Sequence, residues 1–132
     1  MGAQVINPWS WQEQFGFVHG NVVSSAGRTL FVAGQASVGN DGNPVHAGDI
    51  VAQVSKSIDN VEAVLREAGM TLADVVRLNI FTTDVDAFFG AHPSLVARFA
   101  EAGCRPASTL LGVSRLAFPE MLVELEATAV AS

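Results

Sequence analysis

The stretch MLVELEATAV, residues 121–130, decides the fold because its side chains alternate in character. Every second residue is apolar, namely Met121, Val123, Leu125, Ala127 and Ala129. The residues between them mix acidic, polar and apolar character: Leu122, Glu124, Glu126, Thr128 and Val130. Successive side chains of a strand point to opposite faces, so the pattern predicts a strand with one core face and one mixed face.

Further strands are predicted upstream of this one, over residues 15–23, 29–35, 75–83 and 108–115, where β-branched and aromatic residues cluster. The apolar run 29–35 is expected to be buried on both of its faces. A glycine- and asparagine-rich stretch, residues 38–49, is predicted to be a loop.

Two helical regions separate these strands. The first is predicted to begin near Asp49 and to end at Gly69, since Asp is a good N-cap and Gly a good C-cap. Its apolar stripe is formed by Val51, Val54, Ile58, Val61 and Leu65. The second opens at Asp84 and Asp86, and Pro93 is expected to break it and restart it with His92 near the new N-terminus.

The resulting order, ββαβαββ, predicts an α+β fold in which two helices pack on one face of a mixed sheet, with hairpins at both ends of the chain. The length of 132 residues fits a single domain over residues 1–132. With 49% hydrophobic and only 15% charged residues, some apolar surface is expected to be covered by further copies of the chain.

The formal net charge of −6 and the scattered basic residues argue against a nucleic-acid partner. No signal peptide and no membrane span are recognised in the sequence. The single cysteine, Cys104, indicates a reduced compartment, and we expect a cytoplasmic protein. Cys104 as a nucleophile is a weaker alternative, because no base lies beside it in sequence.

Several polar residues are candidates for chemistry. Glu124 and Glu126 lie about 6–7 Å apart at their Cα atoms on a strand, which approaches the spacing of an inverting glycosidase. The stronger alternatives are that both face solvent, or that Glu124 alone is a general base whose pKa is raised by an apolar wall. Gly34 permits the close approach of a backbone or ligand, and Gln35 beside it both donates and accepts.

Metal and nucleotide sites have no support in the sequence. The histidines His19, His46 and His92 lack ligand spacing, and neither an HExxH nor a CxxC pattern occurs. No glycine-rich phosphate loop follows a strand, so no cofactor is expected. His92 is either a core or interface histidine or a ligand contact.

Five segments together resemble the RidA/YjgF family: INPWSWQ…FGFVHG, LFVAGQASV, QVSKSIDNVEAVLREAG, DVVRLNIFTTDVDAF and RPASTLLGVSRLAFPEMLVELEATAV. The resemblance covers nearly the whole chain. It implies a chorismate-mutase-like fold and a homotrimer whose sheets form a central barrel, with a ligand cleft at each subunit interface. The best-known members hydrolyse reactive imines and enamines, such as 2-aminoacrylate, to keto acids and ammonia.

The resemblance also implies a rebuilt cleft. Ser108 stands where catalytic members carry the arginine that clamps the substrate carboxylate, and a hydroxyl cannot replace that bidentate fork. Other family positions are changed as well, from Tyr to Phe17, from Ser to Ala33, from Asn to His92 and from Cys to Leu110. The retained residues are Gly34, Gln35 and Glu124, the last of which is expected to be catalytic by orienting or deprotonating water.

Two functions follow from this comparison. The first is hydrolysis of an imine, enamine or related labile metabolite other than 2-aminoacrylate, with Ser108, Thr109 and backbone N–H groups near Gly34 holding its polar end and His92 moving a proton. The second is a trimer that binds a metabolite or regulates a partner without chemistry. Arg105, or an arginine of a neighbouring subunit, is a candidate substitute for the clamp. A ribonuclease is the least favoured function because of the acidic balance.

Overall fold

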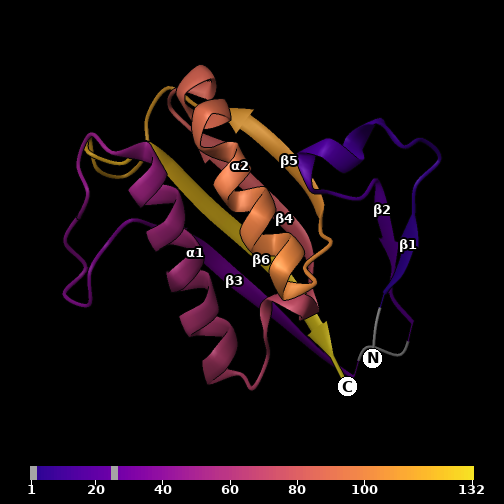
Figure 1. The fold of residues 1–132 in the computed structure, drawn as a ribbon. Helices are drawn as coiled ribbons and strands as arrows, with labels where there is room; N and C mark the ends of the chain where they lie inside the picture. Colours follow the sequence, from indigo (N-terminus) through magenta and orange to yellow (C-terminus); the bar gives the residue numbers. More distant parts are fainter. Residues whose placement is uncertain (1–2, 25–26) are drawn as a thin grey trace.

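A four-stranded mixed sheet with two helices on one face forms the centre of the molecule (Figure 1). The computed structural model describes residues 3–24 and 27–132. In sheet order the strands are β3 (Arg28–Ala36), β6 (Val123–Ala131), β4 (Val75–Thr82) and β5 (Ala107–Gly112), and the helices are α1 (Ile50–Glu67) and α2 (Val85–Ala102). Only β4 and β5 pair in parallel. The predicted α+β class, with helices on one face of a mixed sheet, is confirmed.

Strand β6 joins the two halves of the sheet, because it pairs with β3 on one side and β4 on the other. Its apolar face is buried under the helices, as the alternation predicts, through Val123, Leu125, Ala127 and Ala129. The strand begins two residues later than expected, and Met121 and Leu122 belong to the preceding loop. The mixed face, with Glu124 and Glu126, is directed away from the helices.

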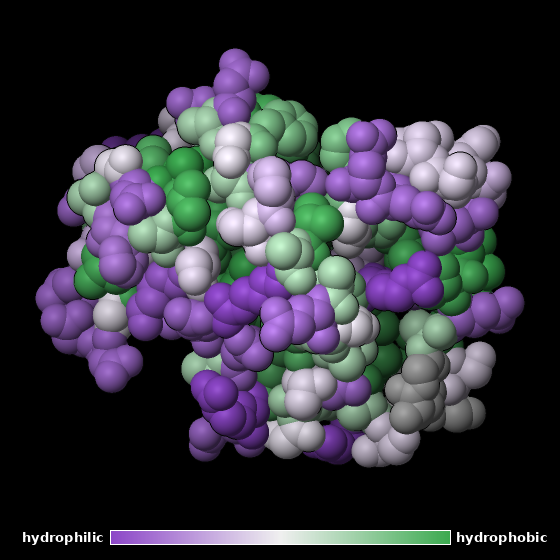
Figure 2. Space-filling model, in the orientation of Figure 1, coloured by the Kyte–Doolittle hydropathy of each residue, from purple (hydrophilic) through white to green (hydrophobic). Residues whose placement is uncertain are grey.

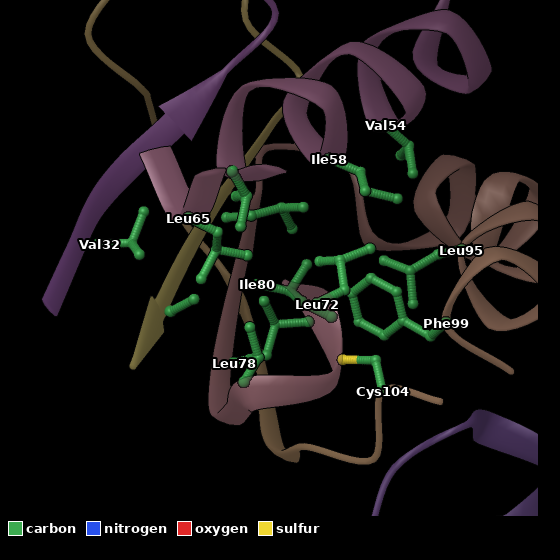
Figure 3. Close-up of a cluster of buried hydrophobic side chains, with 14 of the residues drawn as sticks. Val32, Val54, Ile58, Leu65, Leu72, Leu78, Ile80, Leu95, Phe99 and Cys104 are labelled. Carbon is green, nitrogen blue, oxygen red and sulfur yellow. The ribbon is translucent and has the colours of Figure 1, made fainter. Parts of the chain in front are cut away.

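Helix α1 contributes Val54, Ile58, Val61 and Leu65 to the core. Figure 3 shows Val54, Ile58 and Leu65 among the buried side chains. The prediction for Val51 is wrong, since half of this side chain is exposed. In the first turn, the buried position belongs to Gln53 instead. Its amide donates to the carbonyls of His46 and Glu120 and accepts from the N–H of Leu122. Gln53 thereby ties two loops to the start of the helix.

Helix α2 runs without interruption through Pro93, so the predicted break is wrong. Proline removes one backbone hydrogen bond. The buried side chains of Phe88, Ala91 and Leu95 on both sides of Pro93 pack on the sheet, and this packing holds the helix continuous. His92 consequently lies in the middle of a helix and not at an N-terminus.

The N-terminal segment forms a small sheet of its own beside β5 (Figure 1). It comprises β1 (Gln4–Ile6), the 3-10 helix η1 (Trp11–Phe15) and β2 (Gly20–Val22), which pairs with β1. The predicted strand over residues 15–23 is therefore mostly wrong, because η1 extends to Phe15 and Gly16 ends it with a φ of 75°. Within this region, Val18 makes a single bridge to Ala107 of β5.

Three further predictions need correction. The predicted N-terminal hairpin does not form, because β2 pairs with β1 and not with β3. Strands β5 and β6 do not form a hairpin, because β4 lies between them. Strand β3 is not buried on both faces within one chain, since Phe31 on its outer face is 78% exposed. Among the described residues, no helix combines the length and the apolar composition needed to cross a membrane.

Candidate functional site

A pocket of about 280 Å³ opens between α2, β5 and the segment that follows η1. Four residues predicted to contact a ligand line it together: Phe17, His92, Ser108 and Leu110. The rest of the wall is apolar, including an aromatic group made of Phe15, Phe88, Phe89 and Phe99. Figure 2 shows hydrophobic residues in the depression between the helices and the N-terminal segment. We call this the Ser108 pocket.

The register of the sheet places the two β5 residues in the pocket. Ser108 lies opposite Leu78 and Leu110 opposite Ile80, and both partners belong to the buried core. Ser108 and Leu110 therefore point to the helical side of the sheet. Phe17 reaches the same space because Gly16, in a left-handed conformation, turns the chain directly before it.

His92 is half-buried and faces three phenylalanine rings. Its ring centroid lies 5.6 Å from that of Phe88, 6.1 Å from that of Phe89 and 6.1 Å from that of Phe15. Burial lowers the pKa of His92, and a hydrogen bond with the Phe15 backbone opposes this only in part. At neutral pH the imidazole is therefore neutral, with one nitrogen to donate and one to accept.

Glu124 lies on the other face of the sheet and does not line the Ser108 pocket. Its register partners are Ala36 of β3 and Phe81 of β4. The Glu124 carboxylate rests on Gly34, where a Cβ would be 1.9 Å from Oε1. The bare backbone of Gly34 is what lets the carboxylate lie flat on β3.

The other predicted residues also lie outside the pocket. Ala33 and Gly34 form a bulge in β3, where the register with β6 shifts by one residue between Val32 and Gln35. The Gln35 amide donates to the Ala33 carbonyl at 3.2 Å. Thr109 points away from the helices, and its hydroxyl accepts a hydrogen bond from Arg77 at 2.9 Å.

Three alternatives raised by the sequence find no geometry to support them. Arg105 borders other pockets and not that of Ser108, so within one chain it does not replace a carboxylate clamp. Cys104 is buried, and burial raises its pKa to about 12, which leaves no thiolate to act as a nucleophile. Glu126 is not a free partner for Glu124, because it accepts a hydrogen bond from the Asn79 amide at 2.8 Å.

Sequence reasoning missed the aromatic wall contributed by α2. Phe88, His92, Leu95 and Phe99 follow one another at helical spacing, and this periodicity would have found the wall had the helix not been divided at Pro93. Within residues 3–24 and 27–132, no three side chains of His, Cys, Asp or Glu come together as a metal site would require.

Known proteins resemble this chain in sequence and in fold. Residues 14–131 match the family model described as endoribonuclease L-PSP. A RutC family protein of Pyrococcus abyssi is 35% identical over 103 residues, which are 78% of this chain and 79% of that protein. The 2-iminobutanoate/2-iminopropanoate deaminase of Escherichia coli is 32% identical over 105 residues, or 79% of this chain and 80% of the enzyme.

A solved structure extends the likeness to the whole chain. It is a protein of unknown function of the conserved Rid family from Yersinia pestis, 38% identical, with a TM-score of 0.89 over 98% of this chain and 99% of that one. This chain belongs to the RidA/YjgF family, whose model carries the description endoribonuclease L-PSP.

Proposed function

We propose that this protein hydrolyses an imine or enamine with a bulky apolar side chain, in a cleft that a neighbouring subunit completes. The observation that carries the proposal is the lining of the Ser108 pocket, where Ser108 and His92 are the only polar side chains. The similarity to a deaminase named for 2-iminobutanoate and 2-iminopropanoate supports the reaction class. The apolar wall supports a larger substrate than the one that deaminase is named for.

Substrate binding then rests on burial and not on a carboxylate clamp. A serine hydroxyl gives one hydrogen bond to a carboxylate, whereas an arginine gives a bidentate pair. Burying a side chain of the size of phenylalanine stabilises a complex by about 2–3 kcal/mol. Phe15, Phe17 and Phe89 supply the accessible surface for it, and the buried Phe88 and Phe99 back this wall from the core.

The proposed reaction begins when water adds to the imine carbon. Glu124 accepts a proton from that water as the C–O bond forms, and the imine nitrogen gains a proton to give a carbinolamine. A further proton on nitrogen lets the C–N bond break, and ammonia leaves as the hydroxyl loses its proton and the carbonyl forms. The neutral imidazole of His92 is suited to carry these protons at neutral pH.

A homotrimer would bring the two halves of this site together. Glu124 and Gly34 lie on the face of the sheet opposite to the Ser108 pocket, so one chain does not place them beside Ser108. The same face exposes Phe31 and holds the Asn79 Oδ1 atom, which is buried without a partner among the described residues. Both features support packing against a further copy.

Further properties complete the proposal. We expect a single domain that uses no cofactor. We also expect a cytoplasmic location, which the single free cysteine, Cys104, supports. Nucleic acid remains a poor partner because of the net charge of −6.

The second candidate is a trimer that binds a metabolite without converting it. The observation in its favour is that the described chain leaves the Ser108 pocket without a carboxylate. Phe17 also lacks the hydroxyl that catalytic relatives are expected to carry there. If this candidate holds, apolar keto acids will bind but no imine will be hydrolysed.

Imines generated in place by an amino-acid oxidase separate the two functions. We expect the protein to accelerate ammonia release from the imines of phenylalanine and leucine, and to leave 2-aminoacrylate at its spontaneous rate. Semicarbazide trapping of the remaining imine measures both rates. Acceleration with none of these imines, combined with binding of phenylpyruvate, would establish the non-catalytic candidate.

A further inference from the structure

Two tryptophans of the N-terminal segment are exposed and lie outside the Ser108 pocket. Trp9 is 60% exposed and Trp11 is 55% exposed. Neither lines that pocket, and the proposed imine chemistry makes no direct use of them. Both rings lie edge to face with the ring of His19, at centroid distances of 5.0 Å for Trp9 and 4.9 Å for Trp11. Aromatic pairs of this geometry attract each other beyond the area that they bury.

Phe17 connects these aromatic rings to the pocket. Its ring centroid lies 5.7 Å from that of His19 and 6.0 Å from that of Trp11, again edge to face. The Nε2 atom of His19 is buried without a partner among the described residues, so this side of the imidazole contributes packing and no hydrogen bond. Of the four rings, only that of Phe17 lines the Ser108 pocket.

Phe17 borders open space on two sides. It lines the Ser108 pocket and also a second pocket of about 310 Å³ between η1 and the end of α2. A side chain exchanges between staggered rotamers where its neighbours leave room for more than one of them. Among the described residues, the aromatic rings paired with Phe17 are those of Trp11 and His19, and none of the pocket's other phenylalanines is paired with it.

The backbone on both sides of Phe17 is fixed. The N–H of Gly16 donates to the Glu13 carbonyl at the end of η1, and the N–H of Val18 donates to the Pro106 carbonyl at 2.9 Å. The N–H of His19 donates to Asn7 Oδ1 at 2.8 Å. This leaves the side chain of Phe17 as the part that neighbouring rings can orient.

We propose that Trp11 and His19 are positioning residues, which hold the Phe17 ring at the wall of the Ser108 pocket and so set the size of ligand that binds there. This inference rests on the proposed function, because it takes the Ser108 pocket to be the place where an apolar imine or keto acid binds. With its ring held, Phe17 packs against a bulky ligand side chain. Without Trp11, the ring turns into the space that the indole leaves and loses that contact. A small ligand does not reach Phe17 and loses nothing.

The test measures binding of phenylpyruvate and of the smaller 2-oxobutanoate to the full-length protein by titration calorimetry, which requires no turnover. Trp11→Ala should weaken phenylpyruvate binding by about threefold to tenfold, as loss of an aromatic pair predicts, and should change 2-oxobutanoate binding by less than about twofold. Trp11→Phe keeps a ring and should retain most of the affinity. Trp9→Ala is the matched control and should change either affinity by less than about twofold, because Trp9 is similarly exposed but its ring is paired with His19 and not with Phe17.

A double-mutant cycle separates positioning from a general loss of stability. Phe17→Ala should weaken phenylpyruvate binding, and adding Trp11→Ala or His19→Ala to it should have no further effect, because the residue through which both act is gone. Trp11→Leu removes the ring but keeps an apolar side chain, and it takes the place of Trp11→Ala in the cycle if that variant folds poorly.

Two outcomes would overturn the inference and leave the proposed function standing. They are additive losses of phenylpyruvate affinity in the double variants, and equal losses from Trp9→Ala and Trp11→Ala. Absence of phenylpyruvate binding in the unmodified protein would instead overturn the proposed class of ligand, and this inference with it.

Discussion

The Glu124 carboxylate lies in the space that a side chain at position 34 would occupy, with Oε1 1.9 Å from where a Cβ of residue 34 would stand. Strand β6 therefore presents its acid directly over the bulge of β3. This contact fixes where the proposed base points, although the two residues are far apart in sequence. It also means that the position of Glu124 depends on the absence of a side chain at Gly34.

Gly34→Ala should displace this carboxylate. We expect kcat/KM for an apolar imine to fall by about tenfold or more. The free energy of unfolding should change by less than about 1 kcal/mol, because the new methyl group displaces only the flexible end of the Glu124 side chain. Gly90→Ala is the matched control, since a Cβ there meets nothing within 4 Å. As a helical glycine replaced by alanine, it should gain about 1 kcal/mol of stability. A Gly34→Ala protein of undiminished activity would show that the contact does not position the base.

Ser108→Arg should alter which substrates are accepted. A guanidinium at this position offers a bidentate contact to a carboxylate and fills part of an apolar pocket. Hydrolysis of 2-aminoacrylate should rise above the spontaneous rate, while hydrolysis of the phenylalanine imine should fall. Ser108→Ala, which removes only the hydroxyl, serves as the control and should change either rate by less than about tenfold. If the arginine variant still hydrolyses the phenylalanine imine in preference to 2-aminoacrylate, residue 108 does not determine substrate choice.

Gln53→Leu should destabilise the fold strongly. The substitution removes the hydrogen bonds to His46, Glu120 and Leu122. It leaves the Glu120 carbonyl and the Leu122 N–H unpaired, while the His46 carbonyl still accepts from the N–H of Asp49. We expect the free energy of unfolding to drop by about 2–4 kcal/mol in urea denaturation. Gln14→Leu removes one exposed hydrogen bond, to Trp11, and should cost less than about 0.5 kcal/mol. Similar losses in the two variants would contradict the role given to Gln53.

The stability of the protein should fall as pH drops through the range where a free histidine takes up a proton. Burial lowers the pKa of His92 in the folded state. Below pH 6.5 or so, about the ordinary pKa of histidine, the unfolded chain therefore binds a proton at His92 more readily than the folded chain does. The stabilisation is therefore complete above that value and is lost with increasing acidity. His92→Gln should flatten this part of the curve between about pH 7.5 and about pH 5. Parallel curves for the two proteins would exclude His92 as the cause.

How much of the fold the sequence predicts depends on how local each signal is. The alternation of residues 121–130 predicts both faces of β6, and the caps Asp49 and Asp84 each accept a hydrogen bond from the first turn of their helix. The break predicted at Pro93 is wrong, because packing of α2 on the sheet outweighs the local effect of proline. Strand β1 was not predicted, because its three residues, which pair only with β2, are too few to show the alternation of a strand.

The candidate site is harder to predict, since it depends on register and on faces. Ser108 and Thr109 are neighbours in sequence but point to opposite sides of the sheet, and only Ser108 lines the pocket. The resemblance to the RidA/YjgF family brings Glu124 and Ser108 into one site, whereas the geometry of one chain separates them. Contacts between copies bring distant faces together without leaving a pattern along one chain, and we propose that such contacts reunite Glu124 and Ser108.

Mixing two inactive variants tests the central claim most directly. Glu124→Gln lacks the proposed base but keeps the pocket, and Ser108→Trp keeps the base but fills the pocket. If base and pocket come from different subunits, unfolding and refolding equal amounts together should restore activity at about a quarter of the sites, the fraction that random assembly of two subunit types gives. A mixture as inactive as its two parents, although shown to form mixed oligomers, would contradict the account.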